Sequence, residues 1–403
     1  MKSYAEFFAG VGLVREGLSS SGWHCAWAND ISSDKMMTYC ENFGDCDFWL
    51  GDIWDVVKSP QLIPNDLFLY TASFPCTDLS VAGGRAGLAG AQSGTLNALF
   101  EIIIEKEKTS NKPPVVLLEN VKGFLTSHNG SDAANTVKNF SDLGYVVDII
   151  ELDASRFTPQ SRPRVFIIAV EKSIAKQVMT IKDPNSILDT YWQVFDRQPG
   201  IRTTTLRNLV AMNEELSWGI FDIHPPSQSS LIISDIVESD MVENSPLWWN
   251  DERKEFLFNQ MSERHKDALN ELVKKSFFSY GTVYRRVRKG VSMAELRTDG
   301  LAGCLRTPKG GSSKQILIRA GKGDWRVRLM TPREYARLQG VRDSFKLPSN
   351  ANKGYYAMGD AVCVPVIEFI AKNILDNVYS AWISANNNLQ RQNSCTHIST
   401  VNA

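Results

Sequence analysis

The sequence predicts an α/β fold in which an open sheet carries helices on both faces and is joined to a second, smaller domain. Three observations predict it. Short apolar runs alternate with helical segments in the first part of the chain. The chain opens with a strand, a glycine turn and a helix. Residues 171–325 break this regular spacing. We therefore expect a discontinuous first domain of residues 1–170 and 326–385, a second domain of residues 171–325, and a disordered tail of residues 386–403.

The composition is that of an ordinary soluble globular protein. The 403 residues are 43% hydrophobic and 22% charged, and the net charge is −1. Residues 1–6 lack the basic and apolar regions of a signal peptide, and no apolar run reaches the roughly 18 to 20 residues that span a bilayer. The seven cysteines contain no Cys-x-x-Cys pair, which argues against a disulfide framework or a zinc site. We expect a cytoplasmic protein that binds no metal.

The first three predicted strands each end in a group that can hold a ligand. The strand over residues 4–8 runs into the glycine turn 9–12, and such a turn brings the backbone close to a nucleotide-like ligand at a helix N-terminus. The second strand, residues 23–28, leads to Asp30, whose carboxylate could hold a ribose diol. The third leads to Asp52, which could accept a hydrogen bond from an adenine amino group. Each aspartate could instead cap the helix that follows it.

A cysteine follows the fourth predicted strand, residues 67–70. Pro75 fixes its own backbone torsion and stiffens the segment that presents the Cys76 thiol. The glycines beyond it let the following loop close over a ligand. This position suits a nucleophile, and a structural cysteine at a strand end is the alternative.

Two further strand boundaries carry charged side chains. The apolar run 115–118 predicts a buried strand that ends in Glu119, at the carboxyl edge where open α/β sheets bind ligands. Arg162 and Arg164 precede another apolar strand, residues 165–170. Because they are spaced by two, they point the same way and suit gripping a carbonyl, a phosphate or a carboxylate. Glu119 could also be a helix cap or a surface carboxylate.

The second domain carries a strong local charge. Between Gly281 and Arg328 the chain has 12 basic and 3 acidic residues, a pattern typical of a phosphate-binding surface. Residues 305–315 within it are rich in hydrogen-bonding side chains and loop glycines, which suits the reading of base edges and phosphates. A solvated basic face and an ordinary turn are the alternatives. Further on, Thr331 and Pro332 predict a helix cap and a first-turn proline.

In order and content these elements resemble the DNA (cytosine-5)-methyltransferases, most of all the single-chain enzymes of bacterial restriction–modification systems. The resemblance covers residues 4–376 except the region 171–300, which is variable in that family. The motifs that carry it are Phe8-Ala9-Gly10-Val11-Gly12, Pro75-Cys76, Glu119-Asn120-Val121 and Gln160-x-Arg162-x-Arg164. The chain departs from the family pattern at Glu6, Leu13, Met358 and Asp360.

The resemblance implies a Rossmann-like S-adenosylmethionine-dependent methyltransferase sheet and a smaller target-recognition domain. It implies that Cys76 adds to carbon 6 of a cytosine flipped out of duplex DNA, so that carbon 5 can attack the methyl group of S-adenosylmethionine and leave S-adenosylhomocysteine. Glu119 would hold the N3 proton. Arg164, with Arg162, would steady the O2 carbonyl and orient Glu119. No metal is needed.

The resemblance also implies two sets of binding residues. The cofactor-binding set is Phe8, Ala9, Gly10, Gly12, Leu13, Asn29, Asp30, Ile31, Asp52, Ile53, Pro75, Leu96, Asp360, Ala361 and Val362. The DNA-binding set is Ser80, Arg85, Gln160, Arg306, Thr307, Lys309, Ser312, Ser313, Lys314 and Gln315. We expect a monomer in the bacterial cytoplasm, associated with the nucleoid through its DNA substrate, which a separate cognate restriction endonuclease could accompany.

Other functions would use parts of the same pattern. A tRNA cytosine-5 methyltransferase would share the catalytic core, but the long segment 171–325 favours DNA, because reading a duplex sequence needs a dedicated domain. A non-catalytic DNA-binding protein, or a nicotinamide-dependent dehydrogenase with a coincidental cysteine, would form no covalent adduct with cytosine.

Overall fold

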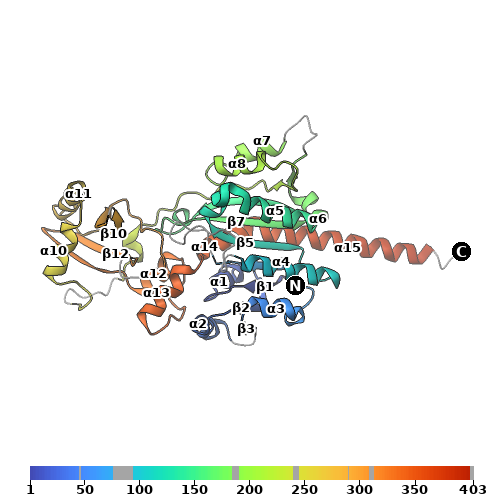
Figure 1. The fold of residues 1–403 in the computed structure, drawn as a ribbon, viewed down its shortest axis with the longest axis horizontal. Coiled ribbons are helices and arrows are strands. Elements are labelled where there is room, and N and C mark those ends of the chain that lie inside the picture. Colours follow the sequence, from blue (N-terminus) through green and yellow to red (C-terminus); the bar gives the residue numbers. More distant parts are fainter. Residues whose placement is uncertain are drawn as a thin grey trace.

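The computed structural model describes residues 1–44, 47–75, 94–183, 190–238, 245–288, 290–307 and 313–399. These residues form a larger body built on one sheet and a smaller body at one end, and a long C-terminal helix projects at the other end (Figure 1). None of the helices in these ranges is long and apolar enough to cross a membrane. The predicted site residues that lie outside the described ranges are Cys76, Ser80, Arg85, Lys309 and Ser312.

Seven strands form the central sheet, in the order β3-β2-β1-β4-β5-β7-β6. Their bounds are β1 Ser3–Phe7, β2 His24–Asp30, β3 Phe48–Leu50, β4 Leu69–Ala72, β5 Val115–Val121, β6 Tyr145–Asp153 and β7 Pro163–Glu171. The first five strands pair in parallel, whereas β7 runs antiparallel to both β5 and β6. The start of β7 therefore lies at the edge where β1 to β5 end, and Val121 pairs with Arg164 there.

Helices cover both faces of this sheet, as predicted. Alternate strand residues point to opposite faces, so that Val115 and Leu117 join one core and Val116 and Leu118 the other. The first core packs against α1 Leu13–Ser19, α2 Ser33–Phe43, α6 Lys172–Val178, α14 Val364–Ile370, η5 Ala371–Leu375 and α15 Asp376–Ser399. The second packs against α3 Ile53–Lys58, α4 Thr95–Lys108, η3 Lys122–Gly130 and α5 Ser131–Asp142. Two short 3₁₀ turns complete this body, η1 Pro60–Leu62 and η4 Ala154–Arg156.

Most of the segment between residues 171 and 236, which the sequence analysis assigned to the second domain, packs instead on the seven-stranded sheet. Its elements are β8 Thr180–Ile181, α7 Thr190–Asp196, α8 Thr204–Ala211 and β9 Gly219–Ile220. The helix α9 Ile233–Ile236 lies instead against β10 and α12. The buried Trp218 and Leu209 join the second core, and Ile233 joins the first. This boundary is not visible in the sequence, because both domains bury the same types of apolar residue.

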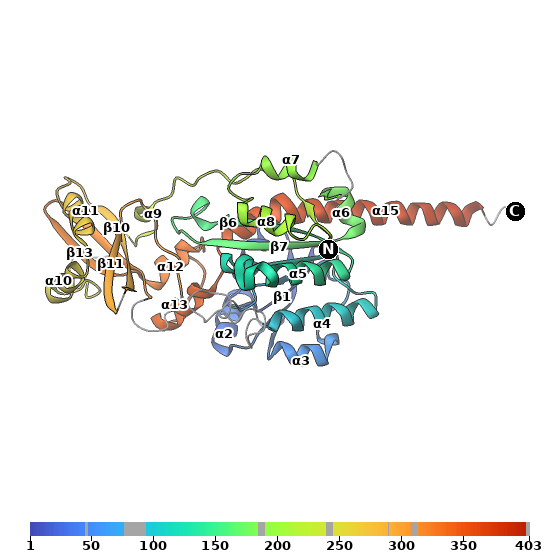
Figure 2. The same cartoon turned by 45° about the horizontal axis from the view of Figure 1, so that its top comes forward.

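The smaller body is an antiparallel four-stranded sheet in the order β11-β10-β12-β13. Its strands are β10 Ser279–Arg288, β11 Val291–Arg297, β12 Ile316–Gly321 and β13 Asp324–Leu329. Two helices, α10 Asp251–Asn259 and α11 Glu263–Val273, bury Leu257, Leu269 and Leu272 against one of its faces. Figure 2 shows this body at the opposite end of the molecule from the C-terminal helix. A separate smaller domain is thus present, although it begins later in the chain than residue 171.

The remaining helices close the larger body. In α12 (Pro332–Leu338) Thr331 and Glu334 form a capping box with a first-turn proline, as the sequence predicts. It is followed by α13 (Ala351–Asp360). The last helix, α15, continues to Ser399, where the sequence analysis expected a disordered tail from residue 386. Its first turns are anchored by Tyr379 and Trp382 against Phe68, and a helix that is already nucleated extends at little further cost.

Candidate active site

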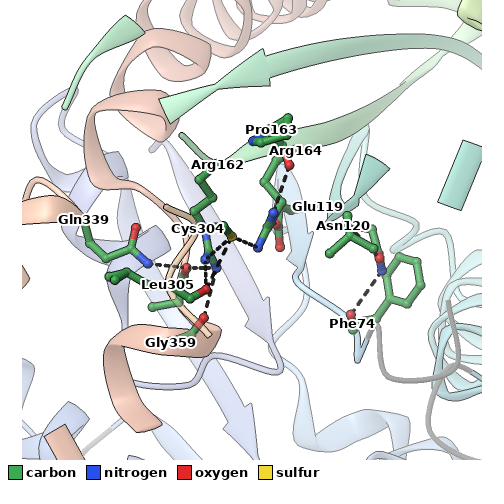
Figure 3. Close-up of polar contacts among 12 residues, drawn as sticks. Phe74, Glu119, Asn120, Arg162, Pro163, Arg164, Cys304, Leu305, Gln339 and Gly359 are labelled. Atoms are coloured by element: carbon green, nitrogen blue, oxygen red, sulfur yellow. Dashed lines mark hydrogen bonds and ion pairs between the residues drawn. The ribbon is translucent and has the colours of Figure 1, made fainter. Parts of the chain in front are cut away.

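The carboxyl edge of the sheet brings together a carboxylate and a guanidinium that are far apart in the sequence. Glu119 lies two residues before the end of β5, and Arg164 is the second residue of β7. In the antiparallel pairing Glu119 lies opposite Phe166 and Val121 opposite Arg164, so Glu119 and Arg164 are diagonal neighbours. Arg164 Nε lies 3.0 Å from Glu119 Oε1, and the side chains are only 14% and 12% exposed. Arg164 Nη1 also donates a hydrogen bond to the carbonyl oxygen of Pro163, at 2.9 Å. The arginine therefore holds the carboxylate in one orientation (Figure 3).

Arg162, two residues earlier, has different surroundings. Its side chain is buried, and its Nη1 and Nη2 groups donate to the carbonyl oxygens of Leu305, Gly359 and Ala361 at 2.8, 3.2 and 2.7 Å. Burial lowers the pKa of Arg162, and the nearby charge of Arg164 adds to this effect. The sequence analysis expected Arg162 to share the catalytic role of Arg164. The structure instead commits both terminal nitrogens of Arg162 to protein atoms.

The segment that leads to Cys76 is fixed from the neighbouring strand. Asn120 Nδ2 donates a hydrogen bond of 3.2 Å to the carbonyl oxygen of Phe74, and Asn120 Oδ1 accepts one of 2.8 Å from its neighbour Val121 N. Phe74 itself packs edge-on against the buried ring of Phe124. The backbone before Pro75 is therefore held at the same sheet edge as Glu119.

The loop after β1 has an unusual backbone that is fastened to the end of β2. Phe8, Gly10 and Gly12 have positive φ angles of 55°, 60° and 82°. Gly10 N donates to Asp30 Oδ2 at 2.9 Å, while Asp30 Oδ1 accepts from Ser32 N. A Cβ added at Gly12 would lie 2.5 Å from the Phe43 ring, whereas one added at Gly10 would meet nothing within 4 Å. At Gly12 the loop is therefore packed closely against Phe43, whereas at Gly10 it borders open space.

The family model of the C-5 cytosine-specific DNA methylases matches residues 3–376 of this chain. The chain belongs to that family. The Type II methyltransferase M.HpaII of Haemophilus parainfluenzae is 24% identical over 393 residues, which cover 93% of this chain and 90% of that protein. The Type II methyltransferase M2.BsuMI of Bacillus subtilis is 33% identical over 177 residues, 44% of each chain. A solved Dnmt2 methyltransferase from S. pombe shares the fold, with a TM-score of 0.58 at 16% identity over 93% of this chain and 99% of that one.

The family assignment and the fold confirm the predicted resemblance, fold class and enzyme class. The cofactor role of the predicted residues of this methylase stays a prediction, and their surroundings are as follows. Asn29 Nδ2 donates to the carbonyl oxygens of Trp49 and Gly51 and so joins the ends of β2 and β3. Ile31 is 71% exposed. Asp52 caps α3 by accepting a hydrogen bond from Trp54 N, which is the alternative that the sequence left open.

The other predicted cofactor residues divide between interior and surface. At Asp360 this chain departs from the family pattern. Its Oδ2 atom lies 3.6 Å from Lys35 Nζ, and the charge of this lysine offsets that of the carboxylate. The carbonyl oxygen of Ala361 accepts hydrogen bonds from both Arg162 and Gln339. Seven predicted cofactor residues have buried side chains, namely Ala9, Leu13, Asn29, Asp30, Ile53, Leu96 and Val362. Leu96 lies in the first turn of α4 and packs into the second core, and its contact with the cofactor stays a prediction.

The predicted DNA-binding residues are also divided. Arg306 is exposed and stacks over the Tyr284 ring at 5.4 Å, next to the half-buried Thr307. Lys314 and its neighbour Ser313 are half-buried, and Lys314 Nζ donates to Asn352. Gln160 and Gln315 have buried side chains, and their role in DNA binding stays a prediction. The Gln160 amide is hydrogen-bonded to Leu338, Gln339 and Leu305, whereas neither polar atom of the buried Gln315 amide has a hydrogen-bond partner among the described residues.

The sequence analysis missed Cys304, whose thiol lies between the two arginines. Its Sγ accepts from Arg162 Nη1 at 3.4 Å and from Arg164 Nη2 at 3.9 Å. Burial opposes ionisation of this thiol, but the charges of Arg162 and Arg164 outweigh it, so the pKa of Cys304 is lowered. No signal in the sequence marks this cysteine, because its charged neighbours come from a distant strand. Within the described ranges, no cluster of His, Cys, Asp and Glu could hold a metal ion.

Proposed function

We propose that this methylase modifies one cytosine within a specific duplex DNA sequence, through a covalent adduct with Cys76, as part of a restriction–modification system. The Glu119–Arg164 pair is the observation that carries the proposal. The O2 and N3 atoms of cytosine are adjacent on one edge of the ring, so a guanidinium and a carboxyl group that are held together can contact both at once. These atoms are paired inside a duplex, so the base must be flipped out before the pair can reach them.

The chemistry follows from the chain's own residues. The Cys76 thiolate adds to carbon 6, which breaks the aromaticity of the ring and makes carbon 5 nucleophilic. Glu119 holds the proton on N3, and Arg164 donates to O2, so both offset the charge that develops on the ring. Loss of the carbon-5 proton to a base then expels Cys76 by elimination and restores the thiolate. The Asn120 contact with Phe74 supports the positioning of the segment that carries this thiol.

The loop after β1 fits S-adenosylmethionine. The open space above Gly10 leaves room for a ligand against the backbone, and Asp30, 2.9 Å from Gly10 N, retains lone pairs that can accept hydrogen bonds from a ribose. The exposed Ile31 offers an apolar surface beside it for an adenine ring. When bound there, this group supplies a methyl carried on a sulfonium, which is electrophilic.

We assign DNA reading to the face of the four-stranded sheet that is not covered by α10 and α11. The covered face carries Val283, Ile318 and Val327. By alternation along the strands, the other face carries Tyr284, Arg286, Arg319 and Arg326. Leu317 lies on this second face and packs into the core of the larger body, which supports the view that the arginines turn toward the catalytic edge.

A comparison of substrates tests the proposal. Methyl transfer from labelled S-adenosylmethionine is measured on duplex DNA and on tRNA, with Cys76→Ser as the inactive control. We expect label in the DNA only and none with the variant. Transfer to tRNA instead would establish the alternative function, and transfer by Cys76→Ser would contradict the covalent route. Bisulfite sequencing of DNA from cells that express the chain then identifies the methylated site.

The setting follows from the substrate and from the names of the relatives, which are Type II methyltransferases. We propose a monomer that acts on nucleoid DNA in the bacterial cytoplasm, where a separate restriction endonuclease would cut the same site when it is unmethylated.

A further inference from the structure

Three segments that are remote in the sequence meet at the buried guanidinium of Arg162. Its side chain is 2% exposed and lies just before β7. Nη1 donates to Leu305 O and Cys304 Sγ, in the loop between β11 and β12, and Nη2 donates to Gly359 O and Ala361 O, at the end of α13 (Figure 3). One side chain thus joins the catalytic strand, the smaller domain and the turn that carries the predicted cofactor residues.

Two glutamines reinforce the same junction, and both are fully buried. Gln160 Oε1 accepts from Leu305 N at 3.1 Å, while its Nε2 donates to Leu338 O and Gln339 Oε1. Gln339 Nε2 in turn donates to the carbonyl oxygens of Met358 and Ala361, at 2.7 and 2.9 Å. We call this set the buried network; its members are Gln160, Arg162, Cys304, Leu305, Gln339, Gly359 and Ala361.

Arg306 and Thr307, in the β11–β12 loop, pack closely against the end of α13. A Cβ added at Gly359 would lie 2.6 Å from Arg306 C and from Thr307 N. The loop also pairs with the chain before β7, since Ala302 N donates to Pro159 O and Ser161 N to Ala302 O. Movement of residues 302–307 would therefore displace the end of α13 or the segment before β7.

Cys304 connects the buried network to the catalytic pair. Its Sγ contacts Arg162 at 3.4 Å and Arg164 at 3.9 Å, and Arg164 is the partner of Glu119. Within the described part of the chain Arg162 makes no ion pair with a carboxylate, so its buried charge depends on carbonyl oxygens and this sulfur. A buried charge is costly unless all of its acceptors are in place. Displacement of any of the three segments would therefore remove acceptors from this buried charge.

We propose that Arg162 is a positioning residue, through which seating of the β11–β12 loop on DNA sets the Glu119–Arg164 pair and the cofactor-side turn. This inference rests on the proposed DNA substrate. The exposed Arg306 follows Leu305 directly, so a phosphate held by Arg306 would pull on the part of the loop that Arg162 holds. Arg162 thereby affects the reaction without touching the cytosine.

The test compares Arg162→Lys with Arg202→Lys. Lysine keeps the charge but cannot make the four contacts of the guanidinium. Arg202 is a matched control, because it is also buried in the larger body and binds Asp148 and Ile149 O, away from the buried network. The rate constant kcat and the KM values for duplex DNA and S-adenosylmethionine are measured at a temperature where thermal melts show each variant folded.

For Arg162→Lys we expect kcat to fall about tenfold or more and both KM values to rise, since one charged hydrogen bond is worth about a factor of ten. For Arg202→Lys we expect a lower Tm with all three constants kept. Wild-type constants in folded Arg162→Lys would overturn the inference, as would equal effects of the two variants. An unaltered chain that methylates no DNA would instead refute the proposed function.

Cys304→Ala keeps the inference testable if Arg162→Lys does not fold. This change removes the sulfur between Arg162 and Arg164 and leaves the carbonyl contacts of Arg162 in place. We expect a severalfold lower kcat with the KM for S-adenosylmethionine unchanged. An unchanged kcat in folded Cys304→Ala would overturn the inference.

Discussion

Arg162 and Arg164 stand two residues apart in one motif, yet they occupy opposite kinds of environment. Arg164 lies at the sheet edge, where its guanidinium pairs with Glu119. Arg162 is buried and binds the backbone carbonyls of two distant segments. The difference arises because Arg162 precedes β7 and is surrounded there by Leu305, Gly359 and Ala361, whereas Arg164 lies within β7 beside β5. We propose that one motif thus supplies a group that binds the substrate and a group that positions the domains.

The largest expected effect is on the Arg164 side of this comparison. Glu119→Gln keeps the size of the side chain but removes the ion pair and the carboxyl group that holds the N3 proton. We expect methyl transfer to fall about 10²- to 10³-fold, as when a transition-state contact is removed, while DNA binding is kept. Initial rates with labelled cofactor measure this. Glu105→Gln, an exposed residue on α4 that pairs with Lys108, is the control and should leave the rate unchanged.

A smaller effect is expected on the Arg162 side. In Gly359→Ala the new Cβ would meet the Arg306–Thr307 backbone at 2.6 Å, so the β11–β12 loop must shift. Overpacking of this kind costs about 1 to 3 kcal/mol, and we expect the rate of methyl transfer to fall about tenfold. Steady-state kinetics and a thermal melt are recorded together. An unaltered rate would show that the position of the loop does not matter to the catalytic pair.

Arg306→Ala distinguishes an effect on DNA binding from an effect on the methyl-transfer step. The side chain is exposed, and its predicted role is to hold a phosphate. We expect weaker DNA binding and a salt dependence of binding whose slope is smaller by about 0.9, the value for one lost phosphate contact. Binding isotherms at several salt concentrations measure both. Arg197→Ala, whose exposed side chain pairs with Asp222, is the control and should not change the slope.

The smallest effect concerns a residue that contacts neither arginine of the comparison. Burial raises the pKa of Glu6 from 4.5 to about 8, although Arg15 opposes this. The folded protein therefore keeps a proton that the unfolded chain releases above its own pKa, so the stability falls as pH rises from 4.5 toward 8. In Glu6→Gln the Tm should decline less over this range than in the unaltered chain. Parallel slopes in melts at successive pH values would refute this.

Local patterns predicted the sheet edge well. Each apolar run ends in a polar residue, and parallel strands bring such ends to one edge, which is why Asp30 and Glu119 could be assigned to it before the fold was known. The capping box at Thr331 is equally local. These features depend on residues within a few positions of one another.

Features that depend on distant contacts were not predictable. The antiparallel insertion of β7 between β5 and β6 decides where Arg164 meets Glu119. The burial of Arg162 depends on Leu305 and Ala361, and Cys304 becomes a neighbour of both arginines only in the folded chain. A sequence pattern indicates which residue types are present, whereas their partners depend on the whole topology.

The most direct test of the account is to map the covalent adduct with duplex DNA that contains 5-fluorocytosine at the target position. The fluorine cannot be eliminated as a proton can, so the adduct persists and the attached peptide can be identified by mass spectrometry. The account predicts one adduct, on Cys76, which is lost in Cys76→Ser. An adduct on Cys304 would contradict the account. The absence of any adduct with unaltered protein that is active would contradict it as well.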